Sequence, residues 1–137
     1  MTNETVVERR YWELLVLGGM ERLPTKNSSY NNKEYWDSRF YSEEEYDWLG
    51  SYEQYQRHLD DLLHPSDQIL MIGCGNSTMS SNLHFSGFKK VTNIDYSENV
   101  IERMKKKYSE LEEMKWYTMD ILEMKFSSGS FDTISGY

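Results

Sequence analysis

The sequence predicts an α/β fold in which helices flank a parallel sheet. Three observations predict it. Residues 69–72 form a short apolar segment that stops at a Gly-x-Gly turn and leads into helix-compatible residues, as a buried parallel strand does. Residues 91–94 read as a second strand, which ends at Asp95. Strand-like and helix-like segments then alternate, which favours parallel strands joined by crossover helices.

Length and composition indicate one folded domain with an acidic surface. The chain has 137 residues, a net charge of −8 and a pI near 4.9, which argues against a nucleic-acid-binding face and suits a basic protein partner. The single cysteine, Cys74, excludes an internal disulfide and fits a reducing compartment. No apolar segment reaches membrane-spanning length and the N-terminus is acidic, so we expect a cytoplasmic protein that does not enter membranes.

The N-terminal part of the chain is predicted to be helical. Apolar side chains at helical spacing predict a helix over residues 6–17, and a polar segment follows to residue 32. Residues 1–29 are interpreted as an N-terminal helix and linker, and residues 30–137 as the domain. Residues 33–41 predict a short aromatic helix. A further helix begins at the capping box Ser51-x-x-Gln54 and ends before Pro65.

The rest of the chain reads as alternating strands and helices. Strands are predicted over residues 68–72, 91–94, 116–119 and 131–135, with a turn over residues 127–130 before the last. A helix over residues 78–85 is closed by Gly87. Ser97 is predicted to cap the next helix, whose basic residues 105–107 are interpreted as a solvated face.

Four residues at the ends of these strands point to a nucleotide-like ligand. Gly73 and Gly75 permit a tight turn and a close approach of the backbone to a ligand. Asp95 follows the next strand, where a carboxylate can accept hydrogen bonds from both hydroxyls of a ribose. Asp120 follows the third strand and could accept a hydrogen bond from an adenine amino group. Carboxyl ends of parallel strands are the ligand-binding edge of such sheets.

Structural roles are the alternative for each of these residues. The glycines could make a tight strand-to-helix connection, and the two aspartates could be helix or turn caps. The aromatic residues upstream of the first strand have core or lid packing as their default role. Cys74 has no histidine near it in the sequence, which favours packing over nucleophilic chemistry. The three histidines show no metal-ligand spacing, so no metal site is predicted.

Several segments together carry a resemblance to a known family. They read Ile69-Leu70-Met71-Ile72-Gly73-Cys74-Gly75-Asn76-Ser77, Asn93-Ile94-Asp95-Tyr96-Ser97 and Thr118-Met119-Asp120. These segments resemble the seven-β-strand methyltransferases that use S-adenosylmethionine. Upstream, Tyr35-Trp36-Asp37-Ser38-Arg39-Phe40 and Tyr46-Asp47-Trp48 resemble the subgroup that modifies lysine in translation elongation factor 1-alpha.

The resemblance implies a Rossmann-like sheet, of which this chain holds the first four strands, and a set of cofactor contacts. Gly73 would lie against the methionine part of S-adenosylmethionine within the loop that also holds Cys74, Gly75 and Asn76. Asp95 would hold the ribose with Tyr96 packed nearby, and Met119 and Asp120 would frame the adenine. Trp36, Phe40 and Trp48 would line the pocket, where aromatic faces attract a sulfonium cation. The expected substrate is a lysine of a translation elongation factor.

The end of the chain departs from the family pattern. The family continues after the fourth strand with an acidic residue, Lys-Gly and a further half-domain, whereas Ser135 or Gly136 stands at the place of the acid here. The chain is therefore interpreted as a truncated form that keeps most cofactor contacts and has weak or no transfer activity. Its fourth strand would be an uncovered edge, which invites association.

Two other functions remain open at this point. A nicotinamide or flavin dinucleotide-binding domain shares the strand, the turn and the distal acid, but Thr78 stands where its third glycine would be. A regulatory or interaction module could bind the cofactor or a partner without turnover. Titration with both cofactors separates the first alternative, and an activity measurement separates the second.

Overall fold

The computed structural model describes residues 24, 26–47 and 50–136. The helix predicted over residues 6–17 and the predicted site residue Trp48 lie outside the described residues. The chain divides into two units after Asn32. In the first, the described residues include a 3-10 helix, η2 (Asn27–Asn31), in which Ser29 N donates to Lys26 O. The second unit begins at Lys33 and contains the sheet.

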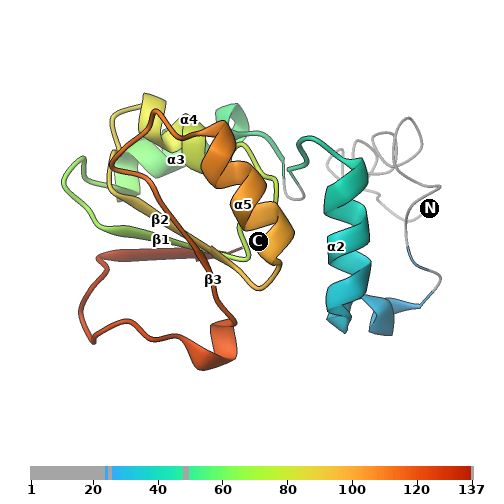
Figure 1. Cartoon of the computed structure of the whole chain (residues 1–137). Coiled ribbons are helices and arrows are strands. Elements are labelled where there is room, and N and C mark those ends of the chain that lie inside the picture. Colours follow the sequence, from blue (N-terminus) through green and yellow to red (C-terminus); the bar gives the residue numbers. More distant parts are fainter. Residues whose placement is uncertain (1–23, 25, 48–49, 137) are drawn as a thin grey trace, which may run out of the picture. The chain divides into compact units, whose positions relative to one another are not determined.

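A four-stranded parallel sheet organises the second unit (Figure 1). Its strands are β1 (Ile69–Ile72), β2 (Val91–Asp95), β3 (Lys115–Thr118) and β4 (Thr133–Gly136). Their order is β3-β2-β1-β4, so the first two strands of the chain lie in the centre. The register pairs Ile72 with Ile94 and Asp95 with Thr118. Strand ends that follow one another in the chain therefore meet at one edge, which confirms the predicted parallel α/β architecture.

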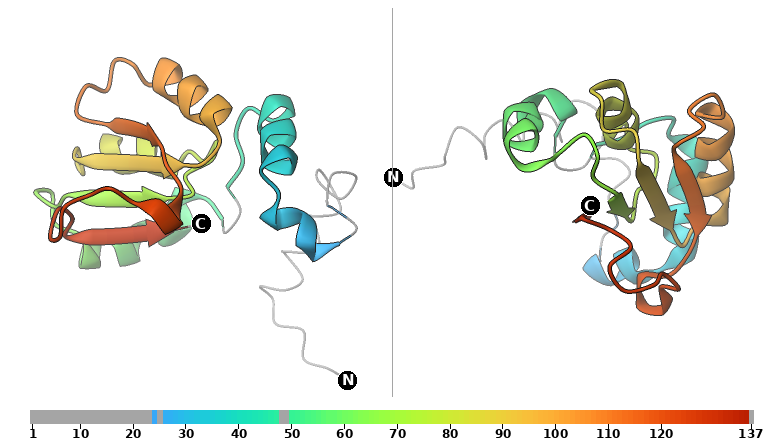
Figure 2. Two further views of the ribbon diagram at one scale, coloured as in Figure 1. Left: turned by 60° about the horizontal axis from the view of Figure 1, so that its bottom comes forward. Right: turned by 90° about the vertical axis from the view of Figure 1, so that its left-hand side faces the viewer.

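Helices cover one face of this sheet. They are α3 (Tyr52–Leu62), α4 (Met79–Phe85) and α5 (Glu98–Lys107), which Figures 1 and 2 show on the same side of the strands. Ile69, Met71 and Val91 point into this layer and belong to its apolar core. α5 carries Val100, Ile101 and Met104 into the same core, a spacing of three and four residues that follows the helical period.

The opposite face of the sheet is partly overlaid by the segment that joins β3 to β4. This segment begins with a short 3-10 helix, η3 (Ile121–Glu123). Tyr117 of β3 packs edge-on against Phe126 at a ring distance of 6.2 Å, and Phe126 packs against Phe131 at 4.9 Å. Leu70 and Ile94, which alternate with the residues of the helical layer, are fully buried.

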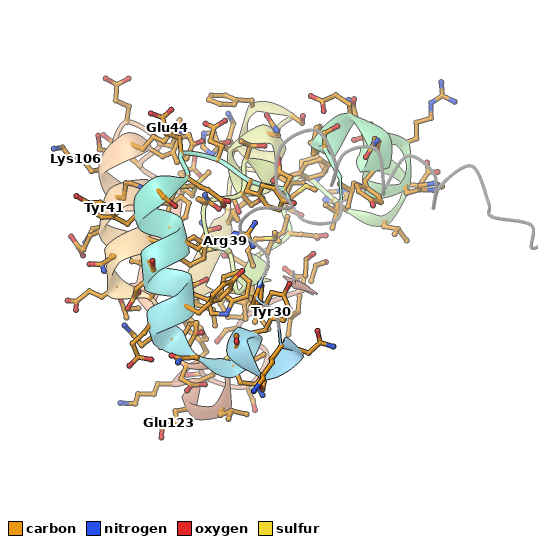
Figure 3. The ribbon with its side chains drawn as sticks, turned by 90° about the vertical axis from the view of Figure 1, so that its right-hand side faces the viewer. Tyr30, Arg39, Tyr41, Glu44, Lys106 and Glu123 are labelled. Atoms are coloured by element: carbon orange, nitrogen blue, oxygen red, sulfur yellow. The ribbon has the colours of Figure 1, made fainter. Side chains whose placement is uncertain are left out.

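The remaining helix, α2 (Lys33–Ser42), packs against α5. Arg103 of α5 donates a hydrogen bond from Nη1 to the carbonyl oxygen of Phe40. Arg39 and Tyr41 lie on opposite sides of α2 (Figure 3), and Arg39 is buried whereas Tyr41 is exposed. The aromatic helix predicted over residues 33–41 is therefore present and is one residue longer than expected.

The local start and stop signals of the helices were predicted with mixed success. At α3 the predicted capping box of Ser51 and Gln54 is present, and Gln54 Oε1 accepts from Ser51 N over 3.2 Å. α5 begins directly after Ser97 as expected, but the predicted role of the Ser97 side chain is wrong. Its hydroxyl makes no capping bond to α5 and donates to Asp37 of α2. A capping bond would use a lone pair of the hydroxyl oxygen and not its proton, so the bond to Asp37 shows only where the side chain is oriented: toward α2 and away from the first N–H groups of α5.

Candidate functional site

The candidate site lies at the carboxyl edge of the central strands, where β1 runs into a tight loop. We call residues 73–78 the glycine loop. Gly73 and Gly75 both have positive φ, 62° and 47°, a conformation that a residue with a Cβ adopts at a cost. Cys74 N donates to Ile94 O over 3.0 Å, so the loop starts by extending the pairing of β1 with β2. Gly73 is exposed at the edge, whereas Cys74 and Gly75 are buried.

Asp95 at the end of β2 is bound to this loop. Its Oδ2 accepts from Gly75 N over 3.0 Å and its Oδ1 accepts from Ser97 N over 2.9 Å. The residue is 5% exposed, and burial raises the pKa of its carboxyl, which the two backbone bonds oppose. Each carboxylate oxygen has two lone pairs, so both oxygens keep one acceptor position for a further donor. This arrangement fits two neighbouring hydroxyl groups.

Two aromatic side chains of α2 reach the same loop. Trp36 and Phe40 stack with ring centroids 5.7 Å apart and an interplanar angle of 29°. A Cβ added to Gly75 would come within 3.0 Å of the Phe40 ring. Because Gly75 has no side chain, the Phe40 ring can pack against it. The sequence analysis had explained this glycine by the close approach of a ligand.

A second carboxylate, Asp37, ties α2 to the end of β2. Ser97 Oγ donates to Asp37 Oδ1, and Lys33 Nζ lies 2.7 Å from Asp37 Oδ2. The hydrogen bond from Lys33, followed by that from Ser97, lowers the pKa of Asp37. The charge of Asp37 also contributes to the raised pKa of Asp95. Two carboxylates with shifts of opposite direction thus stand close to each other at this edge.

The segment that follows α2 runs along the far end of the glycine loop. We call residues 43–47 the connecting segment. Asn76 Nδ2 donates to Glu43 O over 3.3 Å, and Tyr46 N donates to Asn76 O over 3.4 Å. Asp47 accepts three hydrogen bonds from Ser77 and Thr78. The side chain of Asn76, predicted as a cofactor contact, is therefore engaged with the protein backbone.

The third strand brings two more predicted residues to the edge. Met119 N donates to Asp95 O over 2.9 Å, which continues the pairing of β2 with β3. Asp120 is exposed, and its Oδ1 accepts from Leu122 N over 2.8 Å as the N-cap of η3. Its second carboxylate oxygen makes no bond within the described residues that would prevent contact with a ligand. Tyr96 is half-buried, and burial followed by the charge of Asp95 raises its pKa.

The structure brings most of the predicted residues to one edge. Those that it describes there are Trp36, Phe40, Gly73, Cys74, Gly75, Asn76, Asp95, Tyr96, Met119 and Asp120. Their roles toward a ligand remain predictions. Sequence reasoning missed Asp37 and Asp47, because their partners lie 60 and 30 residues away and no local pattern signals the contact.

The residues at this edge fit S-adenosylmethionine better than a metal ion. Asp95 keeps an acceptor position on each oxygen, and Gly73 presents exposed backbone at the same edge. Cys74 is buried, and burial and then the charge of Asp95 raise the pKa of its thiol, which disfavours a nucleophilic thiolate.

Within residues 24, 26–47 and 50–136, no three His, Cys, Asp or Glu side chains are placed to hold a metal ion. In the same part of the chain, no helix has the length and apolar character that crossing a bilayer requires.

Comparison with known proteins finds relatives that share this part of the chain. Residues 69–136 match the family model described as a methyltransferase domain. The chain is 39% identical over 115 residues to EEF1A lysine methyltransferase 4 of Mus musculus and 38% identical to that of Bos taurus. Both alignments cover 82% of this chain and 45% of the relative. It is 31% identical over 118 residues to the eEF1A lysine and N-terminal methyltransferase of Homo sapiens, covering 84% of this chain and 17% of the relative. The chain thus spans under half the length of these relatives.

Proposed function

The chain belongs to the family of methyltransferase domains, and from this premise we propose that it binds S-adenosylmethionine at the carboxyl edge of β1 and β2 and takes part in methylation of a protein lysine. The observation that carries the cofactor proposal is the buried Asp95, held against the glycine loop by Gly75 N with acceptor positions to spare. The substrate proposal rests on the two relatives whose names state a lysine methyltransferase of eEF1A.

The residues of the chain would act on the cofactor by binding and orientation. Asp95 would accept hydrogen bonds from the ribose, and Met119 and Asp120 would hold the adenine. Gly73 offers backbone without a side chain beside the methionine part. Trp36 and Phe40 present aromatic faces, which attract a sulfonium cation. Trp48 completes this aromatic set as a proposal from the sequence alone.

When bound, S-adenosylmethionine would supply an electrophilic methyl group, to which an amine nitrogen can bond in line while the carbon–sulfur bond breaks and S-adenosylhomocysteine leaves. Most of the catalysis then comes from the alignment of amine, methyl and sulfur, which is a matter of placement by the protein. A lysine amine must lose its proton before it attacks, which calls for desolvation or a nearby acceptor.

A methyl-transfer assay beside a binding titration tests the proposal. The chain is incubated with eEF1A and labelled S-adenosylmethionine, and binding of the cofactor is measured by calorimetry. The matched variant is Asp95→Ala, in which cofactor binding should fall, and with it any transfer that the wild type shows. Binding without transfer would favour the cofactor-binding module, and tight binding of NAD with none of S-adenosylmethionine would favour the dinucleotide domain.

The compartment and a second interaction are proposed on the same basis. A cytoplasmic location suits a partner that acts in translation and a chain with one buried, reduced cysteine.

Association through β4 is supported by its position at the edge of the described sheet and by Ile134, which is 60% exposed. Sedimentation of the wild type and of Ile134→Lys over a range of concentrations tests this association.

A further inference from the structure

One carboxylate outside the predicted cofactor contacts holds the far end of the glycine loop. Asp47 Oδ1 accepts from Ser77 Oγ over 2.5 Å and from Thr78 N over 3.0 Å, and its Oδ2 accepts from Thr78 Oγ1 over 2.7 Å. Three bonds from two consecutive residues converge on this single side chain. Hydrogen bonds to a carboxylate are stronger than those between neutral groups. Among the described residues, these three bonds are therefore the strongest link between the connecting segment and the glycine loop.

The bonds reach the point where the loop becomes helix α4. Thr78 is the N-cap residue of α4 and its side chain makes no capping bond to the helix. Ser77 Oγ, which donates to Asp47, also accepts from Met79 N over 3.0 Å. The start of α4 is thus satisfied by Ser77 and by a carboxylate from a distant part of the chain, and a negative charge is favourable at that end of a helix.

Backbone contacts run beside the carboxylate. Asn76 bonds the connecting segment twice, to Glu43 O and to Tyr46 N. Asn76 and Ser77 are buried. The connecting segment and residues 76–78 are therefore joined side by side, and Asp47 supplies the only charged group among these bonds within the described residues.

The other end of the glycine loop is held by different contacts. Gly75 N bonds Asp95, and Phe40 of α2 packs on Gly75. α2 leads directly into the connecting segment, so the loop is held between Phe40 at one end and Asp47 at the other. Release of Asp47 would free residues 76–78 while leaving the bond between Gly75 and Asp95 in place.

We propose that Asp47 is a positioning residue for cofactor binding: it fixes residues 76–78 and so restricts the movement of the glycine loop, whose exposed residue Gly73 the cofactor meets. Asp47 touches no part of the cofactor in this proposal. It acts through Ser77 and Thr78, and it joins the connecting segment to the glycine loop. The proposal rests on the proposed function in that the ligand is S-adenosylmethionine.

The test compares Asp47→Asn with a matched control. Asp67→Asn is the control, because Asp67 also accepts a backbone bond, from His64 N over 2.9 Å, in a turn before β1. Affinity for S-adenosylhomocysteine is measured by calorimetry, and amide hydrogen exchange is measured in both variants. Asp47→Asn should weaken binding about tenfold, the equivalent of one charge-assisted bond. Asp67→Asn should leave it within about twofold.

Hydrogen exchange distinguishes positioning from a general loss of stability. In Asp47→Asn, exchange should rise at the amides of residues 43–47 and 76–79 and stay unchanged at β1 and β2. Asp47→Glu keeps the charge and should recover part of the lost affinity. Equal affinity in the wild type and Asp47→Asn, or unchanged exchange at residues 76–79, would overturn the proposal.

A second variant covers the case in which Asp47→Asn folds poorly. Thr78→Val removes the hydroxyl that donates to Asp47 Oδ2 and accepts from Asn82 Nδ2, and it keeps the shape of the side chain and the bond from Thr78 N to Asp47 Oδ1. It should weaken cofactor binding in the same direction by a smaller factor. If the wild type binds neither S-adenosylmethionine nor its product, the proposed function fails, while the exchange measurement still decides whether Asp47 fixes the loop.

Discussion

Gly75 and Asp95, which are 20 residues apart, are joined by a backbone hydrogen bond of 3.0 Å that closes the glycine loop onto the end of β2. The bond uses one lone pair of Oδ2, and Ser97 N uses one of Oδ1. The carboxylate is thus held in place by the protein before any ligand arrives. Both oxygens face backbone donors, so neither position tolerates an N–H group in place of the oxygen.

Asp95→Asn should therefore cost both stability and binding. An amide puts its NH₂ against either Gly75 N or Ser97 N and leaves one buried donor unsatisfied, which costs about 1–3 kcal/mol of the free energy of unfolding. Loss of charged acceptors for the ribose should weaken cofactor binding about 10-fold to 100-fold. Chemical denaturation and calorimetry measure the two effects separately. Asp120→Asn, at the exposed cap of η3, is the control for stability and should cost under about 1 kcal/mol.

The pH dependence of cofactor binding should follow Asp95. Burial raises the pKa of this carboxyl above its ordinary value of 3.8. The folded state holds its proton more tightly than the unfolded state, so the stability that Asp95 contributes is lost as the pH rises through the interval between the two pKa values. Binding should run the other way, because the ionised form is the better acceptor. Affinity for S-adenosylhomocysteine should rise with pH across this interval, and Asp95→Asn should abolish that rise.

Gly75→Ala should lower the free energy of unfolding more than Gly129→Ala does, although both glycines have positive φ. Gly129 has a φ of 74° and no atom within 4 Å of an added Cβ, so Gly129→Ala carries only the conformational cost of about 1–2 kcal/mol. Gly75→Ala carries a similar cost and also drives its Cβ to 3.0 Å from the Phe40 ring. We expect a larger loss of unfolding free energy, with a loss of cofactor affinity that Gly129→Ala lacks. Equal losses in both variants would mean that Phe40 yields freely.

Elements with local signals could be predicted from the sequence. Strand β1 was recognisable because it is a short apolar segment that ends at a glycine turn, and β2 because its β-branched residues Val91, Thr92 and Ile94 lead to an aspartate. The α3 start was recognisable because Ser51 and Gln54 are three residues apart and bond each other directly. Asp95 was recognisable because its place after the second strand follows from the order of the elements, without knowledge of any side-chain contact.

Contacts between distant segments could not be predicted in the same way. Asp37 and Asp47 are ordinary polar residues of a helix and a loop, and only the fold brings them to Ser97 and to Thr78. The role of the Ser97 side chain was mistaken for the same reason, since its position before a helix indicates a cap, whereas in the fold its hydroxyl is oriented toward a carboxylate 60 residues away. Phe40 was predicted to face a ligand, and its contact with Gly75 depends on how α2 packs.

The aromatic pair of α2 should discriminate the charged cofactor from its neutral product. S-adenosylmethionine carries a sulfonium cation and S-adenosylhomocysteine does not, so an aromatic face stabilises the former by about 0.5–2 kcal/mol more. Trp36→Leu keeps an apolar side chain and removes the ring that stacks on Phe40 at 5.7 Å. Its affinity for S-adenosylmethionine should fall about 2-fold to 30-fold further than its affinity for S-adenosylhomocysteine. Parallel titrations measure this ratio, and an unchanged ratio would place Trp36 outside the sulfonium contact.

Asp37 and Asp95 should show opposite effects of pH on stability, although they lie at the same edge. The hydrogen bonds from Lys33 and Ser97 lower the pKa of Asp37 below its ordinary value of 3.8. Its stabilisation is therefore complete above that value and is lost as the pH falls through the lower pKa of the folded state. Asp37→Asn should cost about 1 kcal/mol at pH 6, a modest value because Lys33 is largely exposed. The difference from the wild type should shrink toward pH 3. Asp95 behaves in the opposite way: burial of its ionised carboxylate destabilises the folded state at pH values above its ordinary pKa of 3.8.

Denaturant titrations of wild type, Asp37→Asn and Lys33→Met over this pH range measure these effects. A difference that grows toward pH 3 would contradict the assignment, whereas loss of the pH dependence in Lys33→Met would identify Lys33 as the main cause of the lowered pKa.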